Sequence, residues 1–114
     1  MILYHGSNVE VKAINLNVCK PFRDFGKGFY LTDIRCQAEN MAKRTQRIKG
    51  GFPVLNVYEI ADDFMSICGL NVRDFSTIPS EEWASFVMNN RNRDYLDLSN
   101  PLCNQDCKYD VVHG

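Results

Sequence analysis

The sequence predicts an α+β domain whose β-sheet is largely antiparallel. Strand-like and helix-like segments follow one another without the regular alternation that a parallel βαβ protein shows. The 114 residues are enough for one domain and leave no room for a second hydrophobic core. We therefore expect residues 1–114 to form a single domain.

The composition is that of an ordinary globular protein, with 45% hydrophobic and 24% charged residues. The formal net charge of −1 provides no overall field that would recruit nucleic acid or an anionic membrane. The most basic stretch is "KRTQRIK", Lys43 to Lys49. Because cations are favoured near a helix C-terminus, the macrodipole alone accounts for a solvated basic face there, and nucleic-acid binding is not indicated.

No apolar run approaches the roughly 20 residues that a membrane helix needs, and "MILYHG" lacks the regions of a signal peptide. We therefore expect a cytoplasmic protein without a membrane partner. The five cysteines are odd in number and scattered, which predicts free thiols. Cys103, Cys107 and His113 lack a fourth neighbouring ligand, so no metal site is expected.

The N-terminal segment "MILY" is a strand candidate that stops at His5-Gly6-Ser7. The segment from Asn8 to Lys20 alternates only in part and fits either an irregular strand or an extended loop. Pro21 blocks a helix and begins a polar, glycine-punctuated loop that leads into "GFYLT".

A helix is predicted through "IRCQAENMAKRTQRI", with Thr32 or Asp33 as its N-cap and Gly50 and Gly51 at its end. Glu39 and Lys43 are spaced to form an i,i+4 ion pair. The apolar stripe at helical spacing consists of Ile34, Ala38, Met41, Ala42, Thr45 and Ile48.

Three elements are predicted beyond this helix, separated by loops. Residues 52–60, "FPVLNVYEI", are rich in β-branched and aromatic residues and predict a strand. "PSEEWASFVMNNR" predicts a helix capped at Ser80 that turns Trp83, Phe86 and Val87 inward. The polar residues 89–106 predict a loop, and "KYDVV" predicts a final strand.

Several common catalytic arrangements do not fit these residues. His5 and His113 are the only imidazoles, and no serine or cysteine has the local glycine elbow of a hydrolase. Gly26 and Gly28 form a GxG, but there is no third glycine, no preceding strand and no Lys-Ser/Thr pair. The segment therefore matches neither a Rossmann nor a Walker phosphate loop.

His5 and Tyr30 each fit two interpretations. An isolated histidine at a strand end is most often a hydrogen-bonded structural residue, and a tyrosine in "GFYLT" is most often part of a core. Alternatively, Gly6 removes side-chain bulk beside His5, so that a ligand amide can reach the backbone there. The presence of both phrases, "LYHGS" and "DFGKGFYLT", favours the ligand-binding interpretation.

"LYHGS" resembles the His-Gly-Ser/Thr strand of the ADP-ribosyltransferases of the poly(ADP-ribose) polymerase and diphtheria-toxin-like class. "FGKGFYLT" is similar to their Phe-Gly-Lys-Gly-x-Tyr-Phe-Ala segment, and the two motifs occur in the same order. The sequence is closest to a small uncharacterised bacterial family grouped with these enzymes. The resemblance implies a split, largely antiparallel β-sheet with flanking helices, whose cleft holds NAD as the substrate.

The resemblance also implies roles for particular residues. His5 would bond a ribose hydroxyl, the backbone of Gly6 would pair with the nicotinamide carboxamide, and Tyr30 would be the second member of a His-Tyr-Glu set. His5 and Tyr30 are therefore the expected catalytic residues. The expected NAD-binding set is His5, Gly6, Ser7, Phe25, Gly28, Tyr30 and Met41.

Two positions depart from the pattern of the resembling enzymes. Met41 stands where they often place a second aromatic ring against the nicotinamide. Their third motif, usually a glutamate, would follow "KYDVVHG", so we expect a domain that is incomplete at its C-terminus. Glu59 and Asp110 are the strand-borne acids that remain as candidates, although both fall earlier in the order than the motif.

Three hypotheses follow for the function. In the first, the intact protein transfers ADP-ribose from NAD to an unknown macromolecular acceptor, as a bacterial toxin with a cognate antitoxin protein. In the second, the domain is degenerate and binds NAD, ADP-ribose or a protein without catalysis. In the third, the two glycine-containing motifs are only structural turns in an interaction module.

Overall fold

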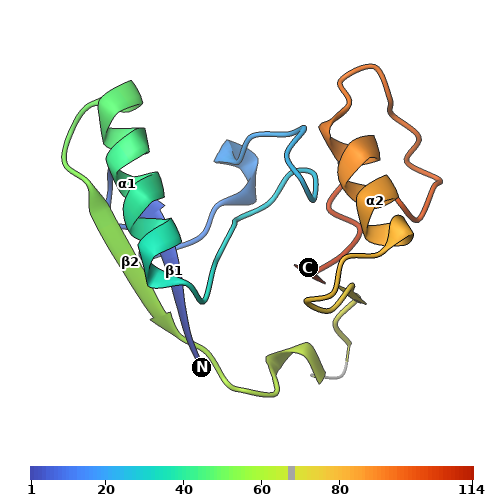
Figure 1. Cartoon of the computed structure of the whole chain (residues 1–114), viewed down its shortest axis with the longest axis horizontal. Helices are drawn as coiled ribbons and strands as arrows, with labels where there is room; N and C mark the ends of the chain where they lie inside the picture. The colour runs from blue at the N-terminus through green and yellow to red at the C-terminus, as the bar shows by residue number, and fades with distance from the viewer. Residues whose placement is uncertain (67–68) are drawn as a thin grey trace. The chain divides into compact units, whose positions relative to one another are not determined.

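The computed structural model describes residues 1–66 and 69–114 (Figure 1). Within this part of the chain it contains helices and short strands, which confirms the α+β class. The elements in order are β1 (Ile2–Ser7), α1 (Arg35–Lys49), β2 (Val54–Glu59), β3 (Val72–Asp74), α2 (Glu81–Arg91) and β4 (Val111–His113). Two 3₁₀ turns lie at Leu16–Val18 and Phe64–Ser66. The first answers the open question about residues 8–20, which form a loop with one turn rather than a strand.

The chain divides into two compact units, and each is described by itself. The first unit consists of Met1–Ile14 and Phe29–Phe64, and the second of Asn15–Gly28 and Met65–Gly114. The predicted single domain remains a prediction. The division falls inside "DFGKGFYLT", so that Gly28 belongs to the second unit and Phe29 to the first.

The first unit is an antiparallel pair of strands with a helix packed against it. β1 pairs with β2 so that Ile2 lies opposite Glu59 and Ser7 lies opposite Val54. α1 runs along this pair (Figure 1). The expectation that the strand "MILY" stops at His5-Gly6-Ser7 is wrong, because β1 includes these three residues. Gly6 does not form a turn here but lies buried beneath α1.

The predicted N-cap of α1 at Thr32 or Asp33 is wrong, since the cap residue is Ile34. Thr32 still organises the helix start, because its hydroxyl accepts a hydrogen bond from the Ile34 N–H at 3.1 Å and donates one to Gln37 at 3.0 Å. The predicted end is confirmed. Gly50 is the C-cap, with a φ of 84° that favours glycine.

The buried stripe of α1 is narrower than the sequence predicts. Ala38 and Ala42 are buried, whereas Met41 is 43% exposed and Ile48 is 70% exposed. Small residues occupy positions 38 and 42 because the helix backbone there lies close to Gly6 of β1. The predicted Glu39–Lys43 pair is also wrong, since Glu39 pairs with Arg35 one turn earlier, at 2.8 Å.

The segment "GFYLT" does not form a strand of its own. Its pairing with β1 is limited to an isolated bridge, in which Tyr4 and Thr32 exchange backbone hydrogen bonds of 2.8 and 3.0 Å. The two motifs therefore pair with each other only at this bridge. The pairing does not continue because the chain turns into α1 soon after Thr32.

The second unit contains β3 and β4, which pair in parallel with Asp74 opposite His113. One of the two strand pairs is thus antiparallel and the other parallel, where the sequence predicted a largely antiparallel sheet. β3 was not predicted, because its three residues are too few to show an alternating pattern. β4 covers the end of the predicted "KYDVV" strand and extends to His113.

α2 begins as predicted, with the Ser80 hydroxyl accepting a hydrogen bond from the Trp83 N–H at 3.1 Å. Of the three residues predicted to face inward, Phe86 is fully buried, and Trp83 and Val87 are half-buried. Phe86 is the centre of an aromatic core. Its ring lies 5.0 Å from that of Phe75 and 6.1 Å from those of Phe25 and Tyr109, measured between centroids.

Two buried asparagines fasten the loop after α2 to this core. The fully buried Asn90 side chain donates to the Phe86 carbonyl at 2.8 Å and accepts from the Asn104 N–H at 2.7 Å. The Asn104 side chain donates to the Phe25 carbonyl at 2.9 Å and accepts from the Tyr109 N–H at 3.1 Å. Side-chain amides thus satisfy backbone groups of a segment that has no regular structure.

Among residues 1–66 and 69–114, no helix is both long and apolar enough to cross a membrane.

Candidate functional site

The backbone of β1 alternates between two edges. Met1 and Ile60 exchange both backbone hydrogen bonds, and Tyr4 exchanges both with Thr32 on the other edge. In an antiparallel pair the backbone N–H and C=O groups of successive residues point to opposite edges of the strand. The backbone of His5 therefore bonds β2, and the N–H and C=O of Gly6 point toward the edge on which Thr32 lies. Gly6 therefore offers a donor and an acceptor at the edge of the sheet, beside the imidazole of His5.

Gly6 has a second role, which is to let α1 pack against β1. A Cβ atom built on Gly6 would lie 1.9 Å from the Ala38 carbonyl oxygen and 2.6 Å from the Ala42 nitrogen. Both neighbours are helix backbone, which cannot yield as a flexible side chain could. The glycine of "LYHGS" is thus required by packing, independently of any ligand.

The His5 ring lies on the face of β1 opposite α1, because side chains alternate along a strand and Gly6 faces the helix. Its Nδ1 lies 2.7 Å from the Tyr30 carbonyl oxygen. A carbonyl only accepts hydrogen bonds, so Nδ1 carries a proton. In the neutral ring Nε2 is then the acceptor, ready to receive a hydrogen bond from a hydroxyl group.

Aromatic rings fix the orientation of the imidazole. The His5 ring stacks on Phe29 with centroids 4.1 Å apart, and Phe29 meets Tyr58 edge-on at 6.2 Å. Neither Phe29 nor Tyr58 is among the residues predicted for the site. The signal was present, because Asn56 and Tyr58 are the polar positions on one parity of "VLNVYE" and share the face of His5.

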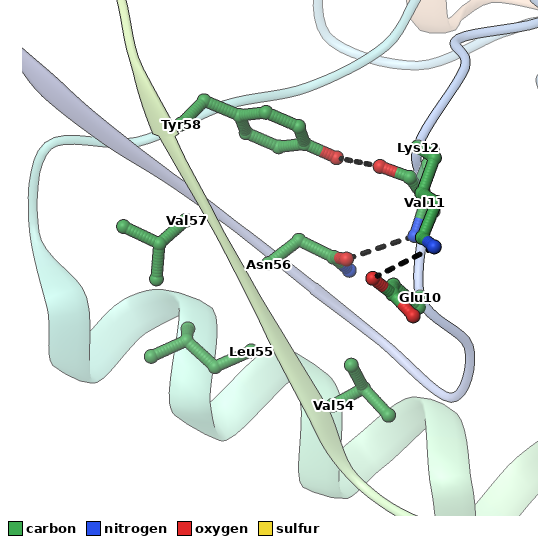
Figure 2. Close-up of a pocket in the computed structure, with 8 residues that line it drawn as sticks. All are labelled: Glu10, Val11, Lys12, Val54, Leu55, Asn56, Val57 and Tyr58. Carbon is green, nitrogen blue, oxygen red and sulfur yellow. Dashed lines mark hydrogen bonds and ion pairs between the residues drawn. The ribbon is translucent and has the colours of Figure 1, made fainter.

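Asn56 and Tyr58 hold the loop after β1 against this face (Figure 2). Asn56 accepts from the Val11 N–H at 2.9 Å and donates to the Val9 carbonyl at 3.1 Å. The Tyr58 hydroxyl donates to the Val11 carbonyl at 2.7 Å. Burial of the ring raises the pKa of Tyr58 above its ordinary value, so this hydroxyl remains a donor at neutral pH.

A hollow beside β2 is lined by residues 10–12 and 54–58 (Figure 2). None of the predicted site residues lines it. Its charged groups, Glu10 and Lys12, are exposed and lie 3.9 Å apart, so they neutralise each other. The chemistry of His5 and Gly6, rather than this hollow, therefore defines the candidate site.

The structure places the other predicted residues as follows. Ser7 ends β1, and its hydroxyl accepts from the Val9 N–H at 3.4 Å. The Tyr30 carbonyl binds His5 directly. Met41 lies on α1, on the opposite face of the strand pair from the His5 ring, and is 43% exposed. His5 and Tyr30 are thus brought together, whereas Met41 does not share the face of the imidazole.

Phe25 and Gly28 belong to the second unit. Phe25 packs against Phe86 in the aromatic core, and its carbonyl accepts from Asn104. The neighbouring Gly26 has a φ of 78°, and a Cβ there would lie 2.7 Å from the Asn104 carbonyl oxygen. Packing and backbone conformation therefore account for the Phe-Gly part of "DFGKGFYLT" without a ligand.

The two candidate acids belong to different units. Glu59 pairs with Ile2, and this parity places its side chain on the face of α1. Asp110 belongs to the second unit, where its carboxylate accepts from the Asn71 N–H at 2.6 Å. The strand positions that share the face of His5 carry no acid in the described pair β1–β2.

Cys103, Cys107 and His113, the residues considered for a metal site, do not share a common partner. Cys103 is fully buried, and the Cys107 thiol donates to the Lys27 carbonyl at 3.2 Å. His113 bonds Asp74 through Nδ1 at 2.8 Å. Among the residues that the structure describes, no group of three or more His, Cys, Asp or Glu side chains could hold a metal ion.

A family model described as a protein of unknown function (DUF3990) matches residues 1–114. The chain belongs to this family. No curated protein and no solved structure matches the chain. The membership identifies the chain's relatives without assigning an activity, so the function is argued from the residues at the site.

Proposed function

We propose that the first unit binds NAD at the edge of β1 and that the protein transfers ADP-ribose from NAD to a macromolecular target. The observation that carries the proposal is the pairing of two features at one edge. Gly6 directs a backbone donor and acceptor outward, and His5 beside it presents Nε2 as an acceptor because Tyr30 holds Nδ1.

These groups match the chemistry of the nicotinamide riboside half of NAD. A carboxamide has one acceptor and one donor side and can pair with a backbone C=O and N–H, while a ribose hydroxyl can donate to Nε2. Stacking on Phe29 restricts the rotation of the His5 ring in the absence of a ligand, which reduces the conformational entropy lost on binding. The resemblance of "LYHGS" and "FGKGFYLT" to the transferase motifs supports the same assignment.

In the transfer reaction the bond between nicotinamide and ribose breaks with its electron pair on nicotinamide, and a nucleophile of the acceptor bonds the ribose carbon. His5 and Tyr30 would orient the ribose in this reaction. A toxin with an antitoxin protein as its partner is the biological setting that the resemblance suggests for such a transferase in bacteria.

A second function is favoured by one observation, the absence of an acid from the described strand positions on the face of His5. A carboxylate that stabilises developing positive charge commonly contributes on the order of 10²–10³ in rate, as other preorganised groups do. Without it, the domain would bind NAD or ADP-ribose and not catalyse transfer.

Calorimetric titration with NAD tests the binding step. We expect His5→Ala to weaken binding by at least tenfold, because Nε2 and the stacked ring are both lost. Tyr30→Phe tests the tyrosine hydroxyl while keeping the carbonyl that holds His5. His113→Ala is the matched control, since it removes the other imidazole, which lies in the second unit.

Absence of NAD binding by the parent chain at millimolar concentration, or equal loss in the His113→Ala control, would reject the site. Release of nicotinamide from bound NAD, or appearance of labelled ADP-ribose on an acceptor, separates the transferase from the binding domain. Binding without either product supports the second function.

A further inference from the structure

The last two turns of α1 carry a cluster of positive charge, which we call the basic face. Its members are Lys43, Arg44 and Arg47, and Lys49 adds a fourth cation at the last residue of the helix. All four side chains are exposed. From Asn40 to Tyr58 the chain contains no aspartate or glutamate, so no acid adjacent in sequence offsets these charges.

The helix geometry directs most of this charge away from the strands. Ala38 and Ala42 face Gly6, which defines the packed side of α1. At about 100° per residue, Arg47 lies roughly opposite Ala38, and Lys43 and Arg44 lie to either side of Arg47. Lys43, Arg44 and Arg47 therefore lie on the side of α1 opposite its contact with β1, whereas Lys49 lies at the angular position of Ala38 and Ala42.

No ion pair or hydrogen bond engages these four side chains in the part of the chain that the structure describes. The nearest acid along the helix, Glu39, is already paired with Arg35 at 2.8 Å. The charges thus remain available to an external anion, whereas exposed charges are often matched by neighbours of opposite sign.

The helix macrodipole accounts for only part of the basic face. It stabilises cations in the last turn, where Arg47 and Lys49 lie. Lys43 and Arg44 precede the helix end by more than a turn, where the effect has fallen off. The sequence-based interpretation of a face required by the macrodipole is therefore incomplete.

An exposed aromatic ring follows the basic face directly. Phe52 is 81% exposed, the largest exposed fraction among the large hydrophobic residues that the structure describes. It stands five residues after Arg47, so their Cα atoms lie within about 18 Å. Cations that contact phosphates, next to an aromatic ring on which a base can stack, are the combination that binds single-stranded nucleic acid.

We propose that the basic face of α1, together with Phe52, is a binding surface for single-stranded nucleic acid. Lys43, Arg44 and Arg47 contact successive phosphates, and Phe52 stacks on an unpaired base. An acidic protein would use the charges but would gain nothing specific from a single exposed ring, so the ring decides between these two partners. The surface is separate from the proposed NAD site and needs no NAD.

Fluorescence anisotropy with a labelled 15-nucleotide oligothymidine, in the absence of NAD, tests this surface. We expect Arg44→Gln/Arg47→Gln to weaken binding about tenfold at low salt. The slope of log affinity against log salt should become shallower by about 1.4, since each lost phosphate contact removes about 0.7 for single strands. Lys20→Gln/Arg23→Gln makes the same change in net charge on exposed residues of the second unit and should have little effect.

Phe52→Ala tests the stacking component. We expect at least fivefold weaker binding with an unchanged salt slope, because a base–aromatic contact is lost and no charge is removed. Ile78→Ala is the control, since Ile78 is 75% exposed and belongs to the second unit. Circular dichroism of each variant establishes that it remains folded.

Three results would overturn the proposal. One is the absence of binding by the parent chain at about 50 mM salt, where phosphate contacts are strong. Another is equal weakening by the α1 variant and its charge-matched control. The third is full competition by polyglutamate together with no effect of Phe52→Ala, which would identify an acidic protein as the partner.

Discussion

At the scale of single residues, one glycine in each motif is required by backbone packing, whether or not a ligand binds. Gly6 lies where a Cβ would meet the Ala38 carbonyl oxygen, and Gly26 lies where one would meet the Asn104 carbonyl oxygen. A glycine beside a histidine can thus be explained by packing alone. What packing does not explain is the direction of the Gly6 N–H and C=O, which address the edge opposite β2.

Gly6→Ala should destabilise the protein by about 1–3 kcal/mol, the usual cost of forcing extra volume into a packed core. The added methyl group would lie 1.9 Å from helix backbone, so α1 must move away from β1. Urea denaturation followed by circular dichroism measures the change. Ser7→Ala on the same strand is the control, and an equal effect of the two substitutions would contradict the packing role of Gly6.

At the scale of elements, the ends of the helices depend on different groups. α2 begins at Ser80, whose hydroxyl satisfies the Trp83 N–H, and Glu81 and Glu82 occupy its first turn. α1 has no side-chain cap at Ile34 and relies on Thr32, two residues earlier. Helix starts of the second kind are hard to locate from sequence, because a threonine that forms a turn looks like a threonine that forms a cap.

Ser80→Ala should lower the free energy of unfolding by about 1 kcal/mol, because it leaves an N–H at the start of α2 without its acceptor. Ser85→Ala is the matched control, since Ser85 is exposed in the interior of the same helix. Thermal or urea denaturation of the two variants measures the difference. A cost for Ser85→Ala as large as that for Ser80→Ala would contradict the capping role.

The pair β3–β4 should make stability depend on acidic pH. Hydrogen bonds from the Ser76 N–H and then from His113 hold the pKa of Asp74 below its ordinary value. A carboxylate with a lowered folded-state pKa contributes stability above its unfolded pKa of about 3.9, and this is lost as pH falls through the folded value.

Because the Asp74 side chain is 49% exposed, solvent screening reduces its contribution to below about 1 kcal/mol. We expect Asp74→Asn to be less stable than the parent at about pH 5 and equally stable well below the folded pKa of Asp74. Urea denaturation at the two pH values measures the gap. A gap for Asp74→Asn that stays constant between the two pH values would contradict the linkage.

At the scale of the whole molecule, stability depends on few buried apolar side chains in each unit. The described buried apolar residues are Ala38 and Ala42 in the first unit and Phe75, Phe86 and Cys103 in the second. Polar groups complete both units, through Asn56 in the first and through Asn90 and Asn104 in the second. A protein built in this way has little reserve against a lost core residue.

Phe86→Ala should therefore remove about 3–5 kcal/mol, a large part of the 5–15 kcal/mol that stabilises a typical domain. The ring is fully buried and contacts three other aromatic rings, so its loss leaves a cavity. Near-ultraviolet circular dichroism and urea denaturation measure the outcome. Phe52→Ala is the matched control, because Phe52 is 81% exposed and its removal should change stability by less than about 0.5 kcal/mol.

The sequence by itself determined the elements whose signals are local. The body and end of α1, the strand β2 and the capped helix α2 follow from helical spacing, β-branched residues, a serine cap and terminal glycines, all of which act within a few residues. The α+β class follows from the order of these elements. The motifs "LYHGS" and "DFGKGFYLT" also marked His5 and Tyr30 as site residues, which stays a prediction, and the His5 ring bonds the backbone carbonyl of Tyr30.

Only the tertiary structure decided what depends on partners distant in the chain. β1 extends through Gly6 because this segment pairs with β2 and packs against α1. Phe29 packs on the His5 ring, and Asn56 and Tyr58 lie on the same face of the strand pair. The tertiary structure also assigned Phe25 and Gly28 to the second unit, whereas the other predicted site residues belong to the first. The physical reason is that strand pairing and side-chain packing join residues far apart in sequence, which no local pattern of residues encodes.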